Sequence, residues 1–284
     1  MHSLAGAAID ETNVSACFYR DALEALTAAG ERFLVGGSHA LVHYTGIARH
    51  TKDFDIFCRR ADIHRVLSVL RDIGARTEIP FPHWLGKGHR DDSLIDVIYC
   101  SGNGVAEVDD RWFQHAPTAE VLGVRARLAP AEETIWSKAF IMERERFDGG
   151  DVSHILLSQG PHLDWARLLE RFGRHWRVLY AHLVLFGFIY PSERARIPRA
   201  VMGELAGRLA REESCPETRR VTYGPLLSRA QYLPEIETGR FEDGRHDAEV
   251  HMTQDEIDLW TRVIDDEVRP HARDEGHDPD RRRR

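Results

Sequence analysis

The chain has 284 residues, of which 42% are hydrophobic and 30% are charged, so it can bury the core of one or two compact units. No run approaches the roughly 18 apolar residues that span a bilayer, and the first residues lack a signal-peptide pattern, which argues against a membrane or secreted protein and predicts a cytoplasmic one. The net charge of −8 argues against a protein that coats nucleic acid, and four scattered cysteines indicate neither a zinc site nor a disulfide framework.

The chain opens with a predicted helix over 14–30 and a buried strand over 32–36. A Gly-Gly-Ser turn follows, and the absence of a side chain at Gly37 lets the backbone approach a ligand. Ser38 can cap the next helix, over 39–45, whose first N–H groups would face a phosphate. An ordinary turn is the alternative interpretation of the glycine pair.

A second strand is predicted over 53–57, where residues alternate between polar and apolar. Period-two geometry places Asp53 and Asp55 on one face, roughly 7 Å apart. Two carboxylates on one face can bind a divalent cation, whereas the solvated face of a strand is the alternative. The link that precedes this strand carries Arg49 and Thr51.

A helix over 61–74 is expected next, followed by a polar loop over 80–93 and a strongly apolar strand over 94–99. Asp96 interrupts that strand. A lone aspartate among apolar residues is costly to bury unless it is paired or binds a metal, so Asp96 is a candidate functional residue. An edge-strand aspartate that faces water is the alternative.

Residues 105–120 are expected to be irregular and 122–128 to form a last short strand. A helix then starts near 129, with proline and acidic residues in its first turn. Lys138 lies near the core face of this helix and could reach phosphate oxygens, although an exposed helix lysine is the alternative. Only three lysines occur against 35 arginines, so a lysine at this position is informative.

The remainder of the chain is predicted to be helical, with a turn-rich stretch over 214–248. The almost wholly apolar segment 175–190 is expected to be a buried core helix, too short to span a membrane. The arginine-rich stretch 163–230 is a candidate surface for RNA or a nucleotide, or else a solvated helix face. The predicted helices cover 163–172, 175–190, 199–212 and 253–268.

The glycine-serine turn, the Asp-x-Asp strand and the later aspartate together resemble the nucleotidyltransferase superfamily, which shares the DNA polymerase β-like fold. More narrowly, Arg49-x-Thr51-x-Asp53-x-Asp55 resembles the motif of the minimal nucleotidyltransferases, which include abortive-infection type toxins. These proteins also carry a lysine in the helix that contains Lys138, followed by an Asp-x-x-Asp segment.

In this chain that segment runs from Asp148 to Asp151 and contains two glycines, and Phe147 stands where a basic residue commonly precedes the first acid. The resemblance covers about 32–155. It implies an α+β nucleotidyltransferase fold with a small mixed sheet and flanking helices, followed by a helical C-terminal domain. The expected boundaries are 1–130 for the catalytic core, 131–270 for the helical domain that completes the cleft, and 271–284 for a disordered tail.

The resemblance further implies transfer of a nucleoside monophosphate from an NTP to a hydroxyl acceptor. Mg²⁺ or Mn²⁺ would be held by Asp53, Asp55 and Asp96, with Asp96 as the candidate general base. The nucleotide-binding residues would be Gly37, Ser38, Arg49, Thr51, Lys138 and Asp151.

The acceptor stays open among RNA or tRNA, a protein and a small molecule such as an aminoglycoside-type antibiotic. A role in a toxin–antitoxin or phage-defence system, with a protein antitoxin as partner, is compatible with the family. A non-catalytic nucleotide-binding or interaction protein that retains the fold is the other class of function.

Overall fold

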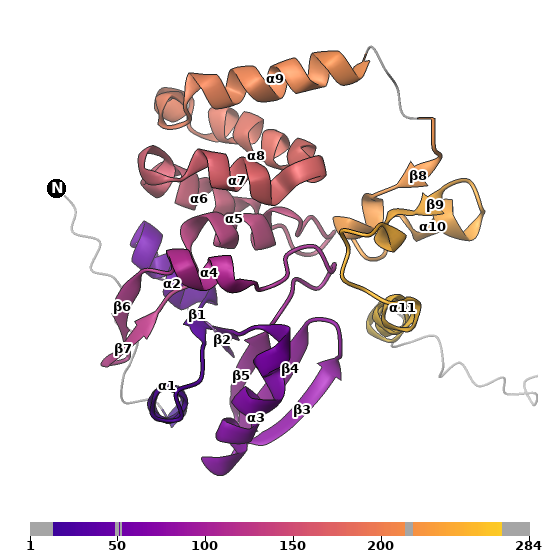
Figure 1. Cartoon of the computed structure of the whole chain (residues 1–284). Helices are drawn as coiled ribbons and strands as arrows, with labels where there is room; N and C mark the ends of the chain where they lie inside the picture. Colours follow the sequence, from indigo (N-terminus) through magenta and orange to yellow (C-terminus); the bar gives the residue numbers. More distant parts are fainter. Residues whose placement is uncertain (1–13, 49–50, 52, 214–217, 269–284) are drawn as a thin grey trace, which may run out of the picture.

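The computed structural model describes residues 14–48, 51, 53–213 and 218–268 as an α+β protein (Figure 1). Its main sheet has five strands in the order β1-β2-β5-β4-β3. Strands β2 and β5 are parallel, and the other neighbours are antiparallel. The predicted α+β class with a small mixed sheet is therefore confirmed. The strands are β1 (Leu34–Val35), β2 (Asp53–Phe57), β3 (Arg76–Phe81), β4 (Leu85–Arg90) and β5 (Ser93–Ile98).

One face of this sheet is covered by helices α1 (Val14–Ala28) and α3 (Ile63–Asp72), as the period-two pattern of the strands requires. Phe54 and Ile56 of β2 are fully buried on this face. Two glycines of β4 let α3 pack closely, because a Cβ at Gly86 would lie 2.9 Å from a methyl carbon of Ile63. The opposite face, which carries the aspartates of β2, is left open toward the rest of the chain.

The later helices stack beyond that open face, as Figure 1 shows for α5 to α9. Helix α2 (Gly37–Thr45) packs against β2 and α6. The helices after α3 are α4 (Asp110–His115), α5 (Ala131–Ala139), α6 (Gly149–Gln159), α7 (Trp165–Phe172), α8 (Trp176–Ile189), α9 (Arg199–Glu213), α10 (Leu233–Glu237) and α11 (Gln254–Val268). Two small sheets pair β6 (Thr118–Val121) with β7 (Val124–Arg127) and β8 (Val221–Thr222) with β9 (Glu242–Asp243). Short 3₁₀ turns are η1 (Arg60–Asp62), η2 (Gly160–His162), η3 (Gly173–His175), η4 (Pro191–Arg196), η5 (Gly224–Leu226) and η6 (Gly244–His246).

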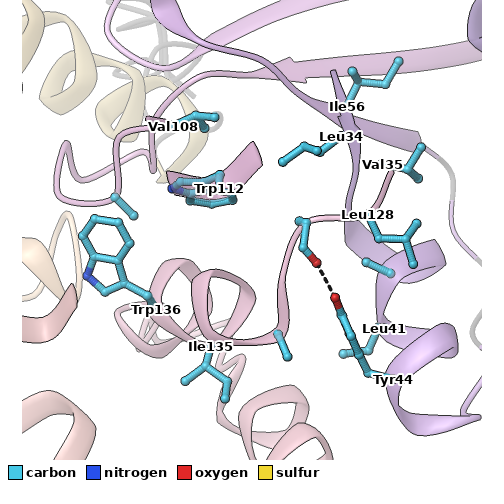
Figure 2. Packing of buried hydrophobic residues seen from close by; sticks show 14 of the residues in the cluster. Leu34, Val35, Leu41, Tyr44, Ile56, Val108, Trp112, Leu128, Ile135 and Trp136 are labelled. Atoms are coloured by element: carbon cyan, nitrogen blue, oxygen red, sulfur yellow. Dashed lines mark hydrogen bonds between the residues drawn. The ribbon is translucent and has the colours of Figure 1, made fainter. Parts of the chain in front are cut away.

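A single hydrophobic cluster joins the sheet to the helical stack. Figure 2 shows the junction, where the Tyr44 hydroxyl of α2 donates a hydrogen bond of 2.8 Å to the carbonyl of Ala129. Leu41 and Leu128 lie beside this bond, and Ile135 of α5 is fully buried nearby. These contacts fix the start of α5 relative to α2, and α5 carries Lys138.

Buried ion pairs with α7 also fix the position of α5. Glu133 of α5 has no exposed surface and contacts two arginines of α7, with Arg167 Nη1 at 2.8 Å and Arg171 Nε at 3.0 Å. Arg167 also reaches Glu132 at 2.5 Å, and Arg171 reaches Asp109, the N-cap of α4, at 2.6 Å. Charged groups that leave water need such partners, so this network holds α4, α5 and α7 in one arrangement.

Two expectations about irregular segments are wrong. The predicted loop over 80–93 contains strand β4 and the end of β3. The β-propensity of β4 is low because it contains glycines at 86 and 88 and several polar residues, so propensity does not predict this strand. Pairing with β5 and packing under α3 make it stable. The predicted irregular stretch 105–120 contains α4 and β6, and Asp109 caps α4 by accepting the N–H groups of Arg111 and Trp112. Trp112 and Phe113 of this helix are buried.

The prediction of a buried core helix over 175–190 holds for only one face of the helix. Helix α8 buries one face, which includes Leu179, Leu183 and Phe186, against α6 and α7. Its other face is open, and Phe188 is 82% exposed. In the part of the chain that the structure describes, no helix combines the length and the apolarity needed to span a bilayer. The predicted tail over 271–284 lies outside the described residues.

Candidate active site

A cavity of about 410 Å³ opens on the free face of the sheet, between β2, β5, α2, α5, α6 and the C-terminal elements. It brings together sequence-predicted residues from five separate stretches of the chain. They are Gly37, Ser38, Thr51, Asp53, Asp55, Asp96, Lys138 and Asp151. Arg49, the remaining predicted residue, lies outside the described residues.

The three aspartates share the cavity because of strand register. β2 and β5 run parallel with Asp55 directly opposite Asp96, and Asp53 lies two residues earlier on the same face of β2. Burial, together with the charges of Asp53 and Asp96, raises the pKa of Asp55 to about 7. A cluster of like charges in a pocket is typical of sites that bind a cation or transfer a proton.

Lys87 is the counter-charge of Asp96, and sequence reasoning missed it. β4 pairs antiparallel with β5 so that Lys87 stands opposite Asp96, with Nζ 3.3 Å from Oδ1. Burial still raises the pKa of Asp96 above its ordinary value, although Lys87 opposes the shift. The rarity of lysine was the available signal, but the segment was interpreted as a loop.

Helix α2 starts earlier than predicted, so the expected cap at Ser38 is wrong. Gly36 is the N-cap, it has no side chain to accept a hydrogen bond, and Ser38 is the second residue of the helix. Gly37 has φ of +52°, and a Cβ there would lie 1.7 Å from Asp55 Oδ2. Glycine is therefore required at 37 both for its backbone conformation and for the close approach of Asp55.

The Thr51 hydroxyl forms hydrogen bonds with Asp53. The hydroxyl oxygen lies 2.7 Å from Asp53 Oδ1 and 2.9 Å from the Asp53 carbonyl oxygen. The hydroxyl carries a single hydrogen, which these two acceptors share. Thr51 thus fixes the orientation of the Asp53 carboxylate at the start of β2.

Lys138 is not an exposed helix lysine, since its side chain is only 16% exposed. Its ammonium contacts Asp148 and Asp151 at 2.9 Å each. Burial alone would lower the pKa of Lys138, but these two carboxylates raise it above its ordinary value. Arg146 donates to Asp148 from the other side at 2.9 Å, and sequence reasoning missed this residue as well.

Lys138 and Arg146 also act on the aspartates of the sheet, because the charges of both oppose the rise in the pKa of Asp55. Two cations from α5 and the 140–148 connection, each paired with a carboxylate of Asp148 or Asp151, therefore share one cavity with the aspartates of β2 and β5. Such a site can hold an anionic group through the cations while the carboxylates hold a metal ion or accept a proton.

The donor set of Asp53, Asp55 and Asp96 consists of hard oxygen ligands, which Mg²⁺ and Mn²⁺ prefer. Each carboxylate is near a protein neighbour, respectively the Thr51 hydroxyl, the backbone at Gly37 and the Lys87 ammonium. Within the described residues, no three His, Cys, Asp or Glu side chains are placed to hold a metal ion as they stand. A cation would have to draw the three carboxylates together.

No protein-family model and no curated protein matches the chain. Among solved structures, the antibiotic-resistance factor ANT(2″)-Ia, in complex with adenylyl-2″-tobramycin, is 14% identical, with a TM-score of 0.39 over 69% of this chain and 99% of its own. The lincosamide antibiotic adenylyltransferase LnuA, with bound lincomycin, is 13% identical, with a TM-score of 0.37 over 50% of this chain and 97% of its own.

A nucleotidyltransferase-like protein from Paracoccidioides brasiliensis is 14% identical, with a TM-score of 0.33 over 58% of this chain and 90% of its own. Identities and TM-scores of this size leave the function to be inferred from the side chains of the cavity.

Proposed function

We propose that the chain is a nucleotidyltransferase that moves a nucleoside monophosphate from an NTP to a hydroxyl group. The observation that carries this proposal is the register of β2 and β5, which sets Asp55 opposite Asp96 in the cavity that also contains Ser38 and Lys138. Carboxylates for a cation and cations for a triphosphate are the two requirements of nucleotidyl transfer.

The triphosphate would lie against the N-terminus of α2. The absence of a side-chain cap leaves the first N–H groups of the helix available to phosphate oxygens, and Ser38 adds a hydroxyl. Lys138 and Arg146 would donate to phosphate oxygens from the opposite wall, through the N–H groups that Asp148 and Asp151 do not use. Asp151 would act through Lys138, whose ammonium it orients.

Asp53, Asp55 and Asp96 would hold Mg²⁺ or Mn²⁺, which supplies charge neutralisation and lowers the pKa of an acceptor hydroxyl when bound. Burial and the charges of Asp53 and Asp96 raise the pKa of Asp55, and a positive ion between the carboxylates would offset both effects. Asp96 would accept the proton of the acceptor hydroxyl.

The decisive experiment measures nucleotide binding and transfer separately. The purified protein is titrated with ATP, GTP, CTP or UTP with and without Mg²⁺, and labelled NTP is then incubated with the protein and a cell extract. Wild type should bind at least one NTP only with Mg²⁺ and should label one fraction of the extract. Asp55→Asn should abolish the effect of Mg²⁺, whereas Asp72→Asn on the exposed surface of α3 should not. Equal binding with and without Mg²⁺ in wild type would contradict the proposal.

A further inference from the structure

The part of the cavity beyond the aspartates is lined mainly by apolar side chains. These large side chains come from β5, from the turn between β3 and β4, from the residues that follow α5 and from the C-terminal region. They are Trp84, Ile98, Phe140, Ile141, Leu226 and Trp260, here called the apolar half. Sequence reasoning assigned none of these residues to a site.

Helix α11 completes the apolar half by placing Trp260 against the turn between β3 and β4, where Figure 1 shows the helix beside the sheet. The Trp260 ring lies edge to face with Phe81 at 4.8 Å and with Trp84 at 5.5 Å between centroids. The guanidinium of Arg229 lies 4.6 Å from the centre of the same ring. Such contacts hold a tryptophan in a fixed orientation, so the apolar half is a formed surface.

The polar groups of this half are already engaged. Glu143 accepts hydrogen bonds from the Ser228 hydroxyl at 2.6 Å and from Arg229 N–H groups at 3.0 and 3.3 Å. Asn103 donates to the Leu226 carbonyl at 2.7 Å and accepts from Ser101 at 2.6 Å. A ligand rich in ammonium groups would have to break the contacts of Glu143, and RNA phosphates would have to take Arg229 from the same carboxylate. Burying charge without a partner is unfavourable, so the apolar half selects uncharged groups.

The apolar half lies on the Asp96 side of the cavity. Ile98 is two residues beyond Asp96 on the same face of β5, and β4, which follows Trp84, pairs Leu85 with Ile98. Gly37 and Ser38, against which the triphosphate is proposed to bind, approach the cavity from the β1–β2 side, where Gly37 meets Asp55. A molecule in the apolar half would therefore present its hydroxyl to Asp96, with the nucleotide on the other side of that residue.

We propose that the acceptor is a small molecule that carries a hydroxyl on an uncharged, ring-containing apolar body, and this inference rests on the proposed function. Its oxygen would form a bond to the α-phosphorus of the NTP while the bond from that phosphorus to pyrophosphate breaks. Pyrophosphate leaves with the bonding electrons, and Asp96 takes the proton of the hydroxyl. The apolar body gains its affinity by leaving water to stack on Trp260 and Trp84.

The test uses 2-naphthalenemethanol as an uncharged hydroxylated ring, neomycin as a polycation and adenosine as a nucleoside, each titrated calorimetrically. Wild type should bind 2-naphthalenemethanol, and Trp260→Ala should weaken this binding at least tenfold. Trp260→Phe should recover part of the loss. Phe188→Ala, which removes an exposed apolar ring from α8, should leave the affinity unchanged. Binding of ATP with Mg²⁺ shows that the Trp260 variants remain folded.

The inference is wrong if neomycin binds wild type more tightly than 2-naphthalenemethanol, or if adenosine displaces 2-naphthalenemethanol, because the ring site would then belong to the nucleobase. Failure of the two proposals can be told apart. ATP binding without any binding of 2-naphthalenemethanol would refute the acceptor class alone. Binding of 2-naphthalenemethanol without Mg²⁺-dependent NTP binding would refute the nucleotidyltransferase proposal instead.

Discussion

Asp55→Asn should stabilise the protein at neutral pH while it removes activity. Burial beside Asp53 and Asp96 raises the pKa of Asp55 to about 7 in the fold, whereas an unfolded aspartate titrates near about 3.9. The folded state therefore holds this proton over a pH range in which the unfolded state has lost it, so Asp55 lowers stability progressively as pH rises through that window. Because a tenfold difference in proton affinity between the two states corresponds to about 1.4 kcal/mol, the full cost above pH 7 approaches about 4 kcal/mol.

Asparagine resembles the protonated acid and removes this cost. The difference in unfolding free energy between Asp55→Asn and wild type should grow by about 3 kcal/mol from pH 5 to pH 8, as measured by urea denaturation without divalent cations. Asp62→Asn is the opposite control. Although burial acts to raise the pKa of Asp62, hydrogen bonds from Arg59 and Arg65 lower it below its ordinary value, so that carboxylate stabilises the fold above its unfolded pKa and the variant should be less stable at neutral pH. A difference for Asp55→Asn that does not change with pH would refute the argument that burial and the neighbouring carboxylates disfavour the charged form of Asp55.

Three further substitutions test the walls of the cavity. Gly37→Ala should cost about 1–3 kcal/mol of stability and should abolish nucleotide binding, because the new Cβ would lie 1.7 Å from Asp55 Oδ2. Gly30→Ala is the control, since Gly30 has φ of +71° but nothing within 4 Å of a new Cβ. In denaturation and binding assays it should show only the cost of the backbone conformation. Ser38→Ala should change the unfolding free energy by less than about 0.5 kcal/mol, because Ser38 is not the N-cap of α2. The same variant should weaken NTP binding by about 1 kcal/mol in calorimetry. A stability loss typical of a lost N-cap would contradict the observed helix start. Lys138→Met should destabilise the fold by about 3–5 kcal/mol at neutral pH, because Asp148 and Asp151 lose the ammonium that both contact. The loss should shrink in acid as Asp148 becomes protonated. A loss of stability that does not depend on pH would indicate an effect of packing alone.

The site residues that could be predicted from the sequence are those marked by a pattern among their immediate neighbours in the chain. Alternation along 53–57 placed Asp53 and Asp55 on one face, and a single acid in an apolar strand marked Asp96, so the structure brings all three into one cavity as expected. Lys87 could not be found in this way. Its strand contains two glycines and no β-branched residue, and it becomes significant only because antiparallel register sets it opposite Asp96.

Long-range packing hid the remaining contributors. Trp260 reaches the cavity from a helix near the end of the described chain, through aromatic contacts that leave no trace in the sequence around it. Arg146 stands two residues before Asp148, where an exposed basic residue in a connection is unremarkable, and its contact with that carboxylate gives it a role. The start of α2 was misplaced for a different reason, since Gly36 serves as N-cap without contributing any side chain.

The buried charges around Glu133 limit how the chain can be shortened. A fragment that stops after α6 would retain the aspartates, Lys138 and Glu133, but it would lack Arg167 and Arg171 of α7. Glu133 would then have no counter-charge in an apolar setting, and α5 would turn it toward water by rotating or unfolding. Lys138, five residues further along α5, would move with it. Minimal versions of this protein for screening or fusion should therefore keep α7, and a separately supplied α7 peptide should restore the fragment in a manner that high salt weakens.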